Sequence, residues 1–226
     1  MYTLSINDRN GTQHNCHLDT IPDACPLCHR GIQPIDMSWN CILDGSLIER
    51  VFMCPLRSCQ HLFIARYKKN PNSGYFFLNQ TTPTEPRNYS HAPELQQISK
   101  DFCEIYNQAQ KSEQLGFALV SGPGYRKALE FLVKDYLTLL QPTDDGKKEV
   151  AELALMPCIR KFVTDARMKA TAERATWLGN DETHYIRKWE DKDLQDMKKF
   201  IQLTCFWIQS EHLTKTGVED MPQGKR

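Results

Sequence analysis

Cys25-Pro-Leu-Cys28 and Cys54-Pro-Leu-Arg-Ser-Cys59, separated by 25 residues, decide the fold of the first part of this chain. Zinc ribbons bind one tetrahedral Zn²⁺ through four thiolates that come from two short turns of this kind. Both pairs begin with Cys-Pro-Leu, which indicates two copies of the same metal-binding turn. Because four cysteines complete the coordination, the spacing predicts one structural zinc ion rather than a catalytic one.

Other uses of these cysteines stay open at the level of sequence. They could form two disulfides or lie separately in a core, although four thiols in this arrangement seldom have another use. Because the second pair has the longer spacing, His61 could replace Cys59 as a ligand, and His29 is a further spare candidate. The remaining cysteines carry no motif and are expected to be small buried residues: Cys16, Cys41, Cys103, Cys158 and Cys205.

Composition limits the class of protein. With 226 residues, the chain can hold one medium domain or two small ones. Lys plus Arg and Asp plus Glu both total 28, so the net charge is zero and any attraction for phosphate must come from a local patch. The chain has no apolar run of about 18 residues and no signal-peptide pattern at its start, so we expect no membrane segment. Nine cysteines with a metal-type spacing suit a reducing cytoplasm, where we expect the protein to reside.

The chain also divides by composition. Branched and aromatic residues at Ser46–Arg50 and Leu62–Tyr67 predict short strands beside the cysteine pairs. A module of this size buries little core, so the metal is expected to hold it together. A stretch rich in Asn, Pro and Thr follows, with one candidate strand at Tyr75–Leu78, and helical periodicity begins after it. We therefore predict a zinc-ribbon module over residues 1–70, a linker over 71–93, a helical domain over 94–213 and a disordered tail over 214–226.

Glycine and proline positions suggest where several helices begin and end. One helix is expected to start at Gly122-Pro123-Gly124, because proline is tolerated in a first turn. The next is expected to run from Ile159 to Trp177 and to stop at Gly179-Asn180, and the last spans about Asp191 to Gln209. The predicted fold class is therefore α+β, with a small β-rich zinc ribbon followed by an all-α bundle.

Four polar residues stand out in the helical part. Arg126 projects into an apolar helical stripe, where Glu130 at i+4 is its obvious partner. Asn180 and His184 follow the predicted helix break, which would place His184 on the first turn of the next helix. Backbone N–H groups at a helix start favour anions, and histidine moves protons at neutral pH. Convergence of these side chains would indicate phosphate chemistry, whereas a core ion pair and a structural histidine are the alternative interpretation.

Two separated motifs resemble a known family. Gly124-Tyr-Arg-Lys-Ala-Leu-Glu-Phe-Leu-Val-Lys-Asp-Tyr136, followed by Trp177-Leu-Gly-Asn-Asp-Glu-Thr-His184, is similar to the bacterial domain family named DUF4145. The resemblance covers roughly residues 95–208, and the cysteine pairs fit a common N-terminal extension of that family. It implies a HEPN-like helical bundle that acts in phage defence or beside restriction-type proteins.

HEPN-like bundles include metal-independent RNases, and the resemblance implies which residues would carry that activity. In such enzymes an arginine and a histidine, four to six residues apart, face their counterparts across a dimer. The arginine stabilises the phosphate and the histidine transfers protons, with the ribose 2′-OH as the nucleophile. His184 matches the family histidine, and Asn180 matches the polar residue before it. The arginine departs from the family pattern, because nine residues lie between Arg174 and His184. Arg126, paired with Glu130, is the other candidate for this role.

Two functions follow as expectations. The first is a recognition module for nucleic acid or protein in a bacterial defence or restriction-like setting, and the neutral charge and the displaced arginine favour it. The alternative is an RNase or toxin that uses His184 with Arg126 or Arg174. The expected partners are RNA or DNA, a defence-system protein and a second copy of the chain in a homodimer.

Overall fold

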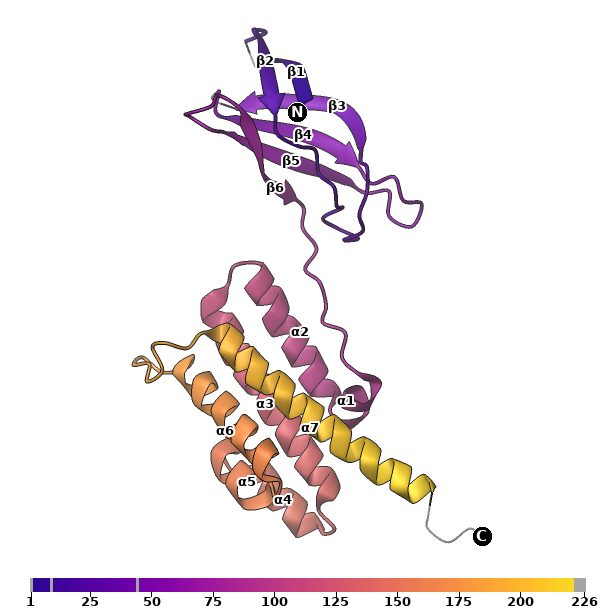
Figure 1. Cartoon of the computed structure of the whole chain (residues 1–226), viewed down its shortest axis with the longest axis vertical. Helices are drawn as coiled ribbons and strands as arrows, with labels where there is room; N and C mark the ends of the chain where they lie inside the picture. The colour runs from indigo at the N-terminus through magenta and orange to yellow at the C-terminus, as the bar shows by residue number, and fades with distance from the viewer. Residues whose placement is uncertain (1, 9, 44, 222–226) are drawn as a thin grey trace. The chain divides into compact units, whose positions relative to one another are not determined.

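The computed structural model describes residues 2–8, 10–43 and 45–221 (Figure 1). The chain separates into two compact units, one ending at Arg87 and the other beginning at Asn88, and each is described by itself below. Within the described part of the chain, no helix is long and apolar enough to cross a membrane.

The first unit is a curled six-stranded sheet (Figure 1). Its strands follow the order β1-β2-β6-β5-β4-β3, and each neighbouring pair is antiparallel except for β2 and β6, which meet in parallel. The strands are β1 (Tyr2–Asn7), β2 (Gln13–Leu18), β3 (Ile35–Leu43), β4 (Leu47–Met53), β5 (Leu62–Lys69) and β6 (Phe76–Thr82).

Alternating apolar residues build the core of this sheet. In β4 and β5 every second residue is buried, as expected for strands with one face turned to a core. Phe52 and Phe63 are direct partners across these strands, and their rings stack with centroids 5.9 Å apart. Ile6 and Leu18 from the first two strands and Phe76 from β6 are buried in the same cluster. The core therefore draws on β1, β2 and β6 as well as on the strands beside the cysteines.

The predicted fold class, a small zinc ribbon followed by a HEPN-like bundle, was wrong. The chain is a mixed α+β protein in which a six-stranded sheet precedes the helices. The sheet is larger than a ribbon because β1 and β2 form a hairpin of their own and β6 joins it to the cysteine-bearing strands. Short strands such as Gln13–Leu18 carry only a few apolar residues, so their periodicity is weak in the sequence. No finding supports a HEPN-like arrangement for the second unit.

The second unit is built from helices around α3 (Figure 1). They are α1 (Pro93–Ile98), α2 (Lys100–Gln114), α3 (Ala118–Leu140), α4 (Asp144–Glu152), α5 (Leu155–Phe162), α6 (Ala166–Asp181) and α7 (Leu194–Asp220). The apolar stripe of α3 is fully or almost fully buried and forms the centre of the core: Tyr125, Leu129, Leu132, Val133, Tyr136 and Leu137.

Several helix boundaries differ from the expected ones. α3 begins at Ala118, so Gly124 lies inside it, where a Cβ would stand 2.9 Å from the Cβ of Ala109 on α2. The glycine therefore permits close packing of α2 on α3 and does not mark a helix start. The expected third helix is divided, because Asp165 caps a new helix by accepting hydrogen bonds from the N–H groups of Arg167 and Met168. α7 continues to Asp220, through residues expected to form a disordered tail.

Candidate functional site

The four cysteines of the two Cys-Pro-Leu turns lie together at one end of the sheet unit. Each offers one sulfur, and the four sulfurs all lie within 4.8 Å of one another. The Sγ atoms of Cys25 and Cys59 are 3.8 Å apart, and those of Cys28 and Cys54 are 3.9 Å apart. A tetrahedron with metal–sulfur bonds of about 2.3 Å has sulfur–sulfur edges of roughly 3.8 Å. The cluster could therefore hold a metal ion, and its cysteines are free rather than joined in disulfides.

The backbone repeats the same construction around each cysteine pair. The N–H of Cys25 donates to the carbonyl of Arg30 at 3.0 Å, and the N–H of Cys54 donates to the carbonyl of His61 at 3.0 Å. The residue after the second cysteine has a positive φ in both turns, 58° at His29 and 52° at Gln60. These bonds fold each turn back on itself, so both of its sulfurs point toward the same place.

Strands position the two turns differently. The second turn connects the end of β4 to the start of β5, which are paired from Leu47–Lys68 to Met53–Leu62. The first turn lies between β2 and β3 and is closed by an isolated bridge between Ala24 and Gly31. The second turn is thus a continuation of the central hairpin, whereas the first is held by its own short bridge.

Burial and hydrogen bonding give the sulfurs different acidities. Cys25 and Cys54 are buried, while Cys28 and Cys59 are partly exposed. The backbone N–H of Arg30 lowers the pKa of Cys28, because it stabilises the thiolate. Desolvation raises the pKa of Cys54 to about 12, so without a cation this thiol is protonated at neutral pH. Binding of a metal ion would therefore release at least the proton of Cys54.

His61, the alternative ligand, lies beside the cluster. Its Nδ1 is 3.5 Å from the sulfur of Cys59, whereas the four sulfurs alone satisfy the geometry of a shared ion. A histidine that does not bind the metal itself can stabilise a ligating sulfur by hydrogen bonding to it. The contacts therefore favour four cysteine ligands with His61 as a neighbour of Cys59.

Arg126, Glu130 and Asn180 converge in the helical unit. Nε of Arg126 donates to Oδ1 of Asn180 at 3.2 Å, and its guanidinium also pairs with Oε2 of Glu130 at 3.2 Å. Lys134 pairs with the other oxygen of Glu130 at 2.9 Å. Desolvation would raise the pKa of Glu130, but the hydrogen bond from Lys134 and the charge of Arg126 lower it. Both oxygens of this ionised carboxylate are occupied by cations, as in a structural ion pair.

Gly179 makes room for the Arg126 side chain. A Cβ at this position would lie 2.9 Å from Cβ of Arg126 and 2.9 Å from Cε of Met197. The glycine is needed where α6 meets α3 and α7, and it does not end the helix. α6 continues to Asp181, so His184 lies in the following loop. The prediction that His184 lies on the first turn of a helix is therefore wrong.

The structure does not gather all the predicted catalytic residues at one place. His184 is exposed and lines an open cleft of about 560 Å³ together with Asn180. Arg126 and Glu130 are not among the residues lining that cleft. Arg174 is exposed on α6, where its guanidinium donates to the carbonyl of Ala170 at 2.9 Å. Asn180 is therefore the one residue that belongs to both the ion-pair cluster and the cleft.

The cleft has an aromatic wall that the sequence reasoning missed. Trp177 and Trp189 stack with their centroids 6.2 Å apart and an angle of 14° between their planes. The buried carboxylate of Asp181 accepts hydrogen bonds from the N–H groups of Lys188 and Trp189, at 2.8 and 2.7 Å, and thereby holds the second tryptophan in place. The only hint in the sequence was two tryptophans separated by a short segment that ends in Arg187 and Lys188.

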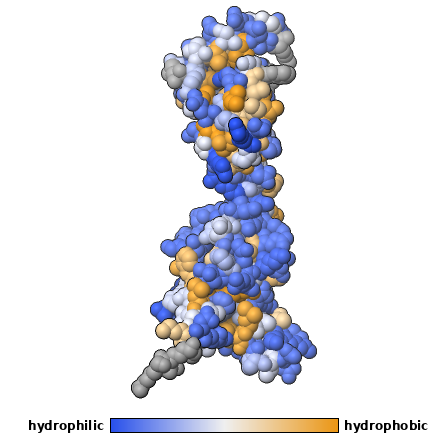
Figure 2. All heavy atoms as spheres, turned by 90° about the vertical axis from the view of Figure 1, so that its right-hand side faces the viewer, coloured by the Kyte–Doolittle hydropathy of each residue, from blue (hydrophilic) through white to orange (hydrophobic). Residues whose placement is uncertain are grey.

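Cations and exposed apolar side chains surround the tryptophan stack. A second cleft, of about 280 Å³, shares Trp177 and Trp189 with the first and adds Arg174 and Lys192 to its lining. Lys188 lines the first cleft. Tyr185 and Ile186 are among the most exposed large apolar residues of the described chain. Figure 2 shows that hydrophobic side chains reach the surface of both units within a largely hydrophilic exterior.

Comparison with known proteins assigns no function to these sites. No family model, no curated protein and no solved structure matches the chain. The resemblance to DUF4145 therefore stays a prediction that rests on the two quoted motifs.

Proposed function

We propose that this protein recognises single-stranded nucleic acid through the tryptophan stack of its helical unit. The stacked and partly exposed Trp177–Trp189 pair is the observation that carries the proposal. Aromatic side chains bind unpaired bases by stacking, which contributes about 1–3 kcal/mol per base without sequence preference. Two clefts are lined by both tryptophans, so a bound strand could enter either cleft while its bases stack on the pair.

Two cations beside the stack support contact with phosphates. Among the described residues, Arg174 and Lys188 have no carboxylate partner, while Lys192 pairs with Asp191 at 3.1 Å and Arg187 with Glu182 at 3.1 Å. The guanidinium of Arg174 lies 5.9 Å from the ring centroid of Trp177, so the cation and the stacking surface adjoin. A local patch of this kind attracts a strand even though the whole chain carries no net charge.

We further propose that the four cysteines hold one structural zinc ion. Thiolate ligands in a tetrahedral arrangement favour zinc over the hard cations magnesium and calcium. The ion would join the turn between β2 and β3 to the β4–β5 hairpin, and so stabilise that end of the sheet. We place this recognition role in bacterial defence, as the DUF4145 resemblance suggests, and in the cytoplasm, as the cysteine content suggests.

The contacts of Arg126 disfavour the RNase alternative. Its Nε and Nη1 groups donate to Asn180 and Glu130, and Arg126 is not among the residues that line the cleft beside His184. His184 does line the cleft and could act on a bound strand. The binding experiment therefore also checks that the RNA is not cleaved.

Binding of fluorescently labelled single-stranded RNA and DNA, measured by anisotropy at low salt, tests the recognition role. Trp189→Ala removes one stacking surface and is expected to weaken binding roughly 5- to 150-fold, the equivalent of one base stack. Arg174→Gln should also weaken binding. The slope of log affinity against log salt concentration should become shallower by about 0.7, as expected for one lost phosphate contact.

Lys148→Gln on α4 serves as the matched control, because Lys148 is an exposed cation outside both clefts. Its affinity for the strand is expected to equal that of the wild type. The proposed function would be contradicted if neither RNA nor DNA bound, or if Lys148→Gln and Arg174→Gln weakened the affinity equally. Cleavage of the RNA that disappears in His184→Ala would instead favour the RNase.

A further inference from the structure

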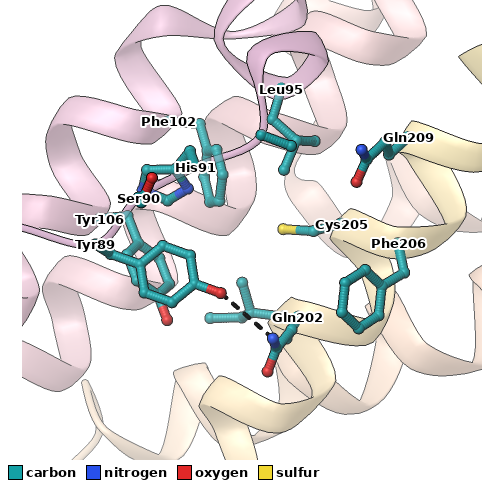
Figure 3. A pocket seen from close by; sticks show the side chains of 12 residues that line it. Tyr89, Ser90, His91, Leu95, Phe102, Tyr106, Gln202, Cys205, Phe206 and Gln209 are labelled. Atoms are coloured by element: carbon teal, nitrogen blue, oxygen red, sulfur yellow. Dashed lines mark hydrogen bonds between the residues drawn. The ribbon is translucent and has the colours of Figure 1, made fainter.

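A small aromatic pocket lies in the helical unit, away from the tryptophan stack. It has a volume of about 170 Å³ and is bounded by the chain entering α1, by α2 and by α7. Figure 3 shows the His91 ring and the Cys205 sulfur on opposite sides of this space. Four of the other lining residues are aromatic: Tyr89, Phe102, Tyr106 and Phe206.

His91 lines this pocket, and one of its ring nitrogens has no hydrogen-bond partner in the described part of the chain. The residue is only 7% exposed, and its Nε2 is buried with no hydrogen-bond partner among the described residues. Its ring is fixed by perpendicular contacts with Phe102 and Tyr106, both with centroids 5.1 Å away. Buried polar atoms are nearly always satisfied, so an unpaired nitrogen in a pocket indicates a missing partner. Desolvation lowers the pKa of His91, which keeps the imidazole neutral at pH 7.

The other polar groups of the pocket are neutral as well. No charged side chain is among the described residues that line it. Burial raises the pKa of Cys205 to about 12, so its thiol stays protonated and does not act as a nucleophile. At the rim, Nε2 of Gln202 donates to the hydroxyl of Tyr89 at 3.3 Å (Figure 3). A charged ligand would find no counter-ion here, and burying it would be costly.

Size and shape narrow the ligand further. A cavity of about 150 Å³ lined by apolar side chains accommodates a benzene molecule, so the volume of this pocket fits one six-membered ring. Aromatic walls favour an aromatic guest in edge-to-face or offset contact. A hydroxyl group both donates and accepts, so it can pair with Nε2 in either tautomer of His91.

We infer that this pocket binds an uncharged, monocyclic phenol-type ring whose hydroxyl group hydrogen-bonds to Nε2 of His91. The inference is independent of the proposed nucleic-acid recognition, because the pocket and the tryptophan stack have no lining residue in common. The ring could be a free small molecule or the side chain of a tyrosine in a peptide. The experiment separates these two sources.

Titration of the full chain with phenol and with benzene, followed by ligand-observed NMR, tests the pocket. Phenol is expected to bind about tenfold more tightly than benzene, because one hydrogen bond contributes about 1–1.5 kcal/mol. His91→Phe keeps the ring contacts and removes the nitrogen, so it should abolish the preference for phenol while benzene still binds. His212→Phe, a histidine of α7 outside this pocket, should leave the preference unchanged.

Two further probes make the result decisive. Cys205→Leu fills the pocket and should weaken the binding of both rings, which tests the location even if His91→Phe fails to fold. Tight binding of N-acetyltyrosinamide assigns the ring to a peptide, whereas binding of phenol alone assigns it to a free compound. Equal affinity for phenol and benzene in the wild type, no binding of either ring, or phenol binding unaffected by Cys205→Leu would overturn the inference.

Discussion

The cysteine cluster of the first unit and the polar cluster of the helical unit are built in different ways. The four sulfurs are brought together by two backbone turns that repeat the same hydrogen bonds, and each turn is a continuous piece of sequence. Arg126 and Asn180 meet only because two helices pack closely at Gly179. A site made by local turns can be read from residue spacing, whereas a site made by packing depends on contacts that spacing does not encode.

Loss of one metal ligand is expected to have the largest effect. Cys54→Ser removes a buried sulfur that completes the tetrahedron, so metal affinity should fall at least 100-fold and the sheet unit should lose more than about 3 kcal/mol of unfolding free energy. Metal content and urea unfolding of the purified variant measure both quantities.

Cys16→Ala is the matched control for this variant, because Cys16 is a buried thiol of the same unit outside the cluster. It should lose about 1 kcal/mol of stability and retain its metal. Equal metal content in Cys54→Ser and the wild type would show that the cluster is not the binding site.

A side chain at Gly179 is expected to have the second largest effect. Gly179→Ala would place a Cβ 2.9 Å from the Arg126 Cβ, which cannot move without moving α3, so the helical unit should lose about 1–3 kcal/mol. Gly217→Ala on α7 is the control, since nothing lies within 4 Å of its added Cβ, and it should be neutral or stabilising by up to about 1 kcal/mol. Thermal unfolding monitored by the helical circular dichroism compares the two. Equal stability of both variants would mean that α3 and α6 do not pack as described.

The smallest expected effect is a pH dependence from His91. Burial lowers its pKa in the folded protein below the unfolded value of about 6.5, so the unfolded state binds the proton more readily. The stability present above pH 6.5 should therefore decline as the pH falls from about 6.5 through the folded pKa. Urea unfolding at pH 7.5 and 5.5 should show a smaller loss for His91→Phe than for the wild type. Parallel losses in the two proteins would contradict the burial of a neutral His91.

Cysteine spacing predicted the four metal-ligating candidates, because the ligands of each turn are only a few residues apart. The same reasoning missed the hairpin β1–β2 and gave the joining strand β6 only as a short candidate at Tyr75–Leu78 inside a linker, since six- or seven-residue strands with few apolar residues resemble loops. Their role is defined by long-range pairing: β6 bonds to β5 and, through Phe76, to Leu18 of β2. Such pairings carry no local signal in a single sequence.

In the helical unit, the pairing of Arg126 with Glu130 followed from the helical repeat, because i and i+4 share one face. The position of His184 could not be predicted from the helical repeat. Gly179 was interpreted as a helix end, whereas it is a packing glycine within α6. The stack of Trp177 on Trp189 depends on Asp181, whose carboxylate folds the following loop back onto the helix. A glycine's role and a loop's path both depend on neighbours that are distant in sequence.

Metal analysis of the purified full chain tests the central claim most directly. Elemental analysis should find one zinc ion per chain, and a strong chelator should remove it and lower the unfolding midpoint of the sheet unit. The helical signal at 222 nm should keep its own unfolding midpoint, because the cysteine cluster lies wholly within the first unit. Metal-free protein whose sheet unfolds at the same urea concentration with and without zinc would contradict the account.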